Sequence, residues 1–330
     1  MNPTIICLIA IIIIALIFEF TNGFHDAANV VSTVIATKAL RPFVAICIAS
    51  ILNFLGATQI SKVAETIISG FLHPNEVSST LLISALCGAI SWNIFTWYLK
   101  IPSSSSYALI GGLIGSSYFL LGLKSIYWTN ILYKVVIPMI LSPLLGIIIS
   151  YLFMNLLNFL ILKKYLNENQ NIFKKLQIFS SSLVALSHGF NDAQKTMAII
   201  TLALFSSKLI FSLSIPIWVI LICSLTMALG TAIGGLRIVK TVGFEITSLN
   251  NYQGFIAEST ASILIILASL FGYPLSSTHI IVGSITGTAL EKDKKIEKKT
   301  MKKIAWAWLL SLPGSAFFAW ICSLLLGLKF

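Results

Sequence analysis

NGFHDAAN at residues 22–29 and HGFNDAQK at residues 188–195 are near-copies of one motif, separated by 166 positions. Each copy places an Asp, Asp26 or Asp192, inside an apolar segment. An Asp at the centre of a hydrocarbon layer costs about 2.5–3.5 kcal/mol even on the lenient insertion scale. Two such residues in matching places therefore predict a transport site formed where two repeats meet.

A second pair of motifs lies at almost the same spacing. PSSSSYALIGGLIG begins at Pro102 and PLSSTHIIVGSITG begins at Pro274, 172 positions later. Because both pairs keep nearly the same offset, a whole half of the chain is duplicated.

The composition places the chain in a membrane. Apolar residues make up 57% of its 330 residues and charged residues only 10%. Ten long apolar runs recur, most of them near the ~20 residues that cross ~30 Å of hydrocarbon. We expect an all-α polytopic membrane protein with about 10–12 membrane segments. The net charge of +11 is concentrated in loops, so it does not indicate nucleic-acid binding.

The basic loops predict the topology. One loop carries Lys163, Lys164, Lys174 and Lys175, and another carries seven lysines within 292–303. Both are expected inside the cell under the positive-inside rule. The first half then crosses the membrane an odd number of times, whether segments 79–99 and 103–121 both span it or together form a re-entrant hairpin. Both termini are expected outside the cytoplasmic membrane.

Two duplicated halves that enter from opposite sides form an inverted repeat, an architecture of secondary transporters. We expect the first repeat at 1–162, a cytoplasmic linker loop at 163–177 and the second repeat at 178–330.

The first motif pair favours cation binding. Glycine costs about 1 kcal/mol inside a helix, so Asn22-Gly23 and His188-Gly189 predict local unwinding and helices interrupted near mid-membrane. Carboxylate, amide and carbonyl oxygens there suit Na⁺ or a proton, and Asp26 and Asp192 are the Na⁺ ligands if sodium is the coupling ion. An ordinary kink with a paired Asp is the alternative. The full set of candidate coupling residues is Asp26, Asp192, Asn22, Asn191, Glu65 and Glu258.

The second motif pair favours anion binding. Each copy has Pro, then hydroxyl residues, then an apolar helix, which predicts re-entrant helix tips with free N–H groups. Such N-termini bind phosphate or sulfate. The candidate residues are Ser104, Ser105, Ser106, Ser276, Ser277 and Thr278. Plain caps at the membrane surface are the alternative, and the GxxxG patterns at 111–115 and 283–287 predict close helix packing.

Two of these acidic residues have a second interpretation. Glu65 lies in LGATQISKVAETIISG, where it is either a cation ligand or an interfacial residue, and Glu258 is the better candidate to face a cavity.

FTNGFHDAANVVSTVIATKAL and SHGFNDAQKTMAIITLAL resemble the paired signature of the inorganic phosphate transporter (PiT) family. The resemblance covers nearly the whole chain. It implies import of orthophosphate coupled to Na⁺ or H⁺, with Asn29 and Gln194 added to the phosphate-site residues. His25 stands where many members have Asn, which leaves the coupling ion open.

Other functions fit less well. A sulfate symporter of the same fold and a passive anion channel are the alternatives, but a channel would not place carboxylates beside its permeant anion. A membrane enzyme is disfavoured because the only arginines, Arg41 and Arg237, lie in different halves. We therefore expect no catalytic residues and no cofactor apart from the co-transported ion, and we leave a homodimer open.

Overall fold

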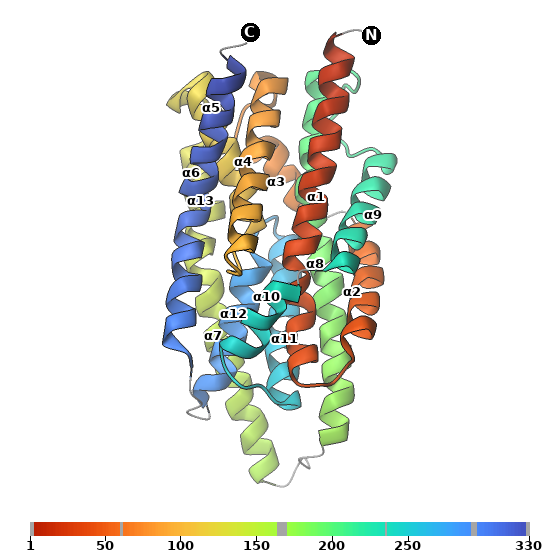
Figure 1. Cartoon of the computed structure of the whole chain (residues 1–330), viewed down its shortest axis with the longest axis vertical. Helices are drawn as coiled ribbons and strands as arrows, with labels where there is room; N and C mark the ends of the chain where they lie inside the picture. Colours follow the sequence, from red (N-terminus) through yellow and green to blue (C-terminus); the bar gives the residue numbers. More distant parts are fainter. Residues whose placement is uncertain (1–2, 60–61, 164–169, 235, 292–295, 328–330) are drawn as a thin grey trace.

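The computed structural model describes residues 3–59, 62–163, 170–234, 236–291 and 296–327. These residues form a bundle of helices and contain no β-strand (Figure 1). The first half contains α1 (Pro3–Ala36), α2 (Pro42–Ala57), α3 (Lys62–Gly70), α4 (Ser79–Tyr98), α5 (Ser105–Leu121), α6 (Trp128–Ile131) and α7 (Ile137–Leu162). The second half contains α8 (Gln170–Ser206), α9 (Ile217–Ile233), α10 (Leu236–Lys240), α11 (Asn251–Leu270), α12 (Ser277–Glu291) and α13 (Lys298–Gly327).

The two halves have the same order of long and short helices. A very long helix, α1 or α8, is followed by a bent pair, an antiparallel pair and a final long helix. In Figure 1, α1 begins at the top of the bundle and α8 begins at the bottom. α8 begins at Gln170, so the last eight residues of the expected loop at 163–177 are helical.

Each half packs against the other through equivalent helices. α1 contacts α9 while α8 contacts α2, and α5 contacts α13 while α12 contacts α7. The GxxxG glycines explain the second set of contacts. A Cβ on Gly115 would lie 2.1 Å from the Ala316 carbonyl oxygen of α13, and one on Gly287 would lie 2.2 Å from the Ile147 carbonyl oxygen of α7. The predicted close packing is confirmed at both patterns.

The expected unwinding at the first motif pair is wrong. α1 runs unbroken through Asn22-Gly23, and α8 runs unbroken through His188-Gly189. These glycines serve helix packing instead, since a Cβ on Gly23 would lie 2.4 Å from the Met227 carbonyl oxygen. A Cβ on Gly189 would lie 2.2 Å from the Asn53 carbonyl oxygen. Glycine lowers the helix propensity at these two positions, but the neighbouring backbone leaves no room for a larger residue.

Interrupted helices occur elsewhere in the bundle. α2 and α3 are bent by 63° relative to each other, and α9 is bent by 71° relative to the segment Ile238–Glu245. The capping residues of the tips agree with prediction: Ser104 accepts a hydrogen bond from the Tyr107 N–H, and Ser276 accepts one from the His279 N–H at 3.3 Å.

Five helical segments in the described part of the chain are long and apolar enough to cross a membrane, and counting each bent pair as one span gives seven. The expected number of 10–12 also included α5, α8 and α12. α5 and α12 have only 17 and 15 residues, and α8 carries polar residues over most of its length.

Candidate functional site

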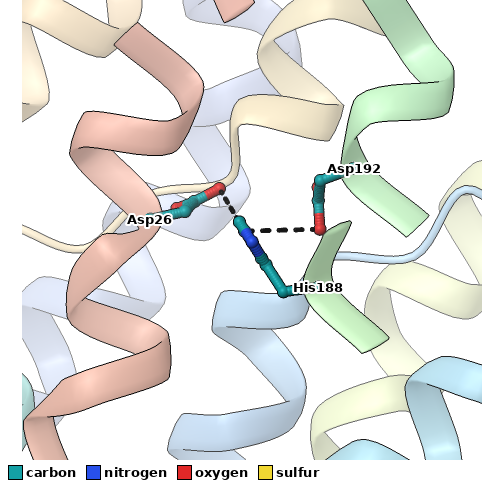
Figure 2. A group of neighbouring side chains, drawn as sticks. All are labelled: Asp26, His188 and Asp192. Carbon is teal, nitrogen blue, oxygen red and sulfur yellow. Dashed lines mark ion pairs between the residues drawn. The ribbon is translucent and has the colours of Figure 1, made fainter. Parts of the chain in front are cut away.

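The two motif carboxylates meet inside the bundle with one histidine between them (Figure 2). Asp26 lies on α1, and His188 and Asp192 lie one turn apart on α8. The His188 Nε2 atom is 3.9 Å from the Asp26 Oδ2 atom and 3.5 Å from the Asp192 Oδ2 atom. All three side chains are buried. The sequence prediction that Asp26 and Asp192 act at one place is consistent with this geometry.

Asp26 is held by neutral donors from three helices. The Asn29 Nδ2 group donates to the Asp26 Oδ1 atom at 3.0 Å and to the Thr278 Oγ1 atom at 2.7 Å. The Thr278 hydroxyl in turn donates to the Ser103 carbonyl oxygen at 3.0 Å. The Ser105 hydroxyl lies 2.6 Å from both the Asp26 Oδ2 atom and the Asn22 Oδ1 atom.

Asp192 is held by a buried lysine. The Lys195 ammonium, three residues along α8, forms a short ion pair with the Asp192 Oδ1 atom and donates to the Ser106 hydroxyl. Ser106 donates to the Leu275 carbonyl oxygen at 3.1 Å, and the Lys195 Nζ atom lies 3.5 Å from the same oxygen. Lys195 is only 1% exposed.

The surroundings of Asp26 and of Asp192 are built from residues at equivalent positions of the two repeats. Asn29 and Asp26 correspond to Lys195 and Asp192 at the offset of 166, and Ser106 and Ser103 correspond to Thr278 and Leu275 at the offset of 172. Each tip hydroxyl, on Thr278 or Ser106, bonds a backbone carbonyl of the opposite tip and lies 3.4 Å from the motif carboxylate of its own site. The start of α5 and the start of α12 therefore meet each other and the two carboxylates at one point.

The remaining predicted phosphate residues divide into two groups. Ser104, Ser276 and Ser277 are buried at the same helix starts. Gln194, by contrast, donates from its Nε2 group to the Gln59 carbonyl oxygen at 2.6 Å. Its amide is therefore directed to the end of α2 rather than to the serine tips.

Among the predicted coupling residues, Asn191 joins the site and Glu65 does not. The Asn191 Nδ2 group lies 3.0 Å from the Leu275 carbonyl oxygen and 3.3 Å from the Asp192 Oδ2 atom. Glu65 is exposed on α3, outside the buried cluster. The structure thus separates Glu65 from the cation-binding groups with which it was predicted.

Glu258 forms a second buried carboxylate site. It accepts hydrogen bonds from the Thr33 hydroxyl, from the Ser180 hydroxyl at 2.5 Å and from the Gln177 amide at 3.3 Å. Its donors come from α1 and α8, the helices that also carry the motif aspartates. Glu19, also buried, accepts a hydrogen bond from Thr196 and so links α1 to α8.

Lys195 and His188 also belong to this group of side chains, although neither was predicted as a site residue. A signal was present, because aligning the two motifs pairs Lys195 with Asn29 and His188 with Asn22. A lysine at that register, in the middle of a long membrane helix, requires a buried acidic partner. The Nε2 atom of His188 has no hydrogen-bond partner in the described residues although it lies between two carboxylates.

The arrangement can bind ions of both signs. Carboxylate, amide and hydroxyl oxygens are suited to hard cations, while the two helix starts present donors suited to a tetrahedral anion. The two carboxylates lie close to these donors, so both kinds of group occupy one place in the fold.

The sequence profile of the phosphate transporter family matches residues 22–319. The chain belongs to the phosphate transporter family. A Rhizobium meliloti protein named "Probable low-affinity inorganic phosphate transporter" is 40% identical over 318 residues, which cover 96% of this chain and 95% of that protein. A Bacillus subtilis protein of the same name is 37% identical over 334 residues and is matched along its full length.

A solved structure described as "The sodium-dependent phosphate transporter" is similar to this fold. Its TM-score is 0.89 at 25% sequence identity, and the match covers 98% of this chain and all of that one. The resemblance to the phosphate transporter family and the all-α membrane fold are confirmed. The chain is a multi-pass membrane protein whose family carries out transport rather than catalysis.

Proposed function

We propose that the chain is a secondary active symporter that imports inorganic phosphate across the cytoplasmic membrane together with Na⁺ or H⁺. The observation that carries this proposal is the meeting of two serine-rich helix starts with two buried carboxylates from duplicated motifs. The family and the printed names of the relatives support phosphate as the anion. The name of the structural neighbour supports Na⁺.

Phosphate is proposed to bind between the two tips, Ser104–Ser106 and Ser276–Thr278, with Asn29 beside them. Backbone N–H groups at the starts of α5 and α12 would supply donors, and the tip hydroxyls would complete the shell. Several of these hydroxyls donate to carboxylates or carbonyls in the described state. They have to turn toward the anion when it binds. Gln194 would have to leave the Gln59 carbonyl oxygen to take part.

Transported cations are proposed to bind within the site that Asp26 and Asp192 form, with the amides of Asn22 and Asn191 beside it. A dianion next to two carboxylates in a low-dielectric interior is strongly repelled, so the anion binds only after positive charge has arrived. This requirement couples the two fluxes and disfavours a passive channel. Glu258 is proposed as a further coupling or gating group because it is buried among donors from α1 and α8.

The membrane potential sets the minimum coupling. Moving one elementary charge across 100 mV corresponds to about 2.3 kcal/mol, so importing a dianion against an inside-negative potential of this size costs about 4.6 kcal/mol. Two co-imported cations cancel this cost, and a third would allow the potential to drive uptake.

The proposed orientation places the linker end of the bundle in the cytoplasm. Lys174 and Lys175 lie in the first turns of α8, and Lys302 and Lys303 lie in the first turns of α13. Both helices begin at the bottom of Figure 1, opposite the starting end of α1. The positive-inside rule then puts both termini outside. The opposite directions of α1 and α8 support an inverted repeat with halves 1–162 and 178–330.

Uptake of labelled phosphate into proteoliposomes tests the proposal. A Na⁺ gradient and a pH gradient are imposed separately, with excess sulfate as competitor in parallel samples. We expect one gradient to drive accumulation of phosphate above equilibrium and sulfate to compete weakly. Phosphate that only equilibrates under either gradient would refute symport, and equal inhibition by sulfate would favour a general oxyanion carrier.

A further inference from the structure

The two halves of the site differ by one charged group. Position 29 is an asparagine and its repeat equivalent, position 195, is a lysine. The Asn29 amide donates to Asp26 and Thr278, and the Lys195 ammonium donates to the equivalent Asp192 and Ser106. The same place beside each carboxylate therefore holds a neutral donor in one repeat and a full positive charge in the other.

We propose that Lys195 is a tethered counter-ion that replaces an exchangeable cation at Asp192. In this arrangement Asp26 is the carboxylate that binds a transported cation, and Asp192 is neutralised permanently by the protein. The chain would then move one cation fewer per phosphate than a transporter with asparagine at position 195. This inference rests on the proposed function and specifies how the charge of the anion is balanced.

The contacts of Lys195 support this assignment. An ammonium group has three N–H donors, and the Lys195 Nζ atom is surrounded by the Asp192 carboxylate, the Ser106 hydroxyl and the Leu275 carbonyl oxygen. Carboxylate, hydroxyl and carbonyl oxygens are also the ligand types of hard metal cations. The ammonium thus occupies the oxygen-lined position that a bound cation would otherwise take.

Asp26 lacks such a partner. Its ion-pair contacts within the described ranges are the imidazoles of His25 at 3.3 Å and His188 at 3.9 Å. The hydroxyl of Ser105 and the amide of Asn29 are neutral. Its carboxylate consequently remains available for a cation that can dissociate.

A tethered charge and a dissociable charge have different effects on transport. Lys195 stays with the protein during both the loaded and the empty crossing, so its charge adds nothing to the net transfer. A cation at Asp26 crosses once per cycle and is released. The slope of the logarithm of phosphate accumulation against the logarithm of the cation gradient reports only the second kind.

The test compares the wild-type protein with Lys195→Asn, which gives the second repeat the Asp-x-x-Asn pattern of the first. The control is Lys208→Asn, which removes an exposed lysine two residues after the end of α8. Na⁺ or pH gradients of graded size are imposed across the proteoliposome membrane, and the steady-state accumulation of phosphate is measured. We expect the slope for Lys195→Asn to exceed the wild-type slope by one cation per phosphate, with the control unchanged.

A binding measurement covers a variant that folds but does not transport. The melting temperature of purified Lys195→Asn is expected to rise more in Na⁺ than in choline, and this rise is expected to be larger than that of the wild type. The reciprocal variant Asn29→Lys is expected to lose Na⁺ dependence. An unchanged slope together with an unchanged Na⁺ response in Lys195→Asn would overturn the inference. Absence of phosphate uptake by the wild type would instead overturn the proposed function.

Discussion

The pairing of Lys195 with Asp192 predicts that the two motif aspartates differ in their importance for stability. Asp192→Asn would leave the Lys195 ammonium buried without its carboxylate. Removing one partner of a buried ion pair costs about 3–5 kcal/mol because the remaining charge is uncompensated. Asp26→Asn removes a carboxylate whose closest donors are neutral or imidazole groups. We expect it to cost about 1–3 kcal/mol, the penalty for leaving a buried hydrogen-bonding group without its partner.

Thermal unfolding of the purified variants in detergent measures this difference, with Asp26→Asn as the matched control from the other repeat. We expect Asp192→Asn to melt clearly below Asp26→Asn. Adding Lys195→Asn to Asp192→Asn should recover much of the loss, since the double variant removes the unpaired charge. Equal melting temperatures for the two single variants, or no recovery in the double variant, would show that Lys195 is not bound to Asp192 as described.

Four further outcomes follow from the site. Asp26→Asn should abolish cation-driven phosphate uptake while size-exclusion chromatography still shows a folded protein, and wild-type uptake would remove Asp26 from the coupling groups. Glu258→Gln should change the dependence of uptake on Na⁺ or pH more than the preference for phosphate over sulfate, and an unaltered ion dependence would leave it a structural role. Ser105→Ala or Ser277→Ala alone should weaken phosphate binding by about 1–3 kcal/mol, seen as a higher phosphate concentration for half-maximal uptake. The double variant should be far more damaging than either single variant, and small, additive effects would contradict a shared anion site. Gly189→Ala should lower stability by about 1–3 kcal/mol, as overpacking does, because its Cβ would lie 2.2 Å from the Asn53 carbonyl oxygen, and an unchanged melting temperature would contradict the packing described.

The duplicated motifs were sufficient to predict the centre of the site. Asp26, Asp192 and the two serine tips could be grouped from sequence because repeat-related groups are expected to lie around one pseudo-two-fold axis. The structure places Asp26, Asp192, Ser105 and Ser106 in one hydrogen-bonded cluster. The GxxxG packing was predictable for the same reason, since the small residues recur at helical spacing in both halves.

The errors concern contacts that lie far away in sequence. Gly23 and Gly189 were predicted to break their helices because helix propensity is a local property. They are glycines because the backbones of Met227 and Asn53, on other helices, leave no space for a side chain. Glu65 was grouped with the cation ligands because it lies in an apolar stretch of sequence, whereas the structure exposes it on α3.

Lys195 was overlooked for a different reason. A cation site is predicted from oxygen ligands, and a lysine competes with such a site rather than contributing to it. Only the comparison of the two halves in space shows that its ammonium and the Asn29 amide have the same neighbours.

The exchange of partner helices between the two halves has a consequence for the synthesis of the protein. α5 packs on α13 and α7 packs on α12, and both of these partner helices are translated after the whole first half. Until then, the glycine-lined side of α5 and the Gly146 side of α7 have no native covering. Both interfaces can form only after α12 and α13 have been made. Truncation before α13 would therefore leave α5 without one of the two helices that it packs on most extensively.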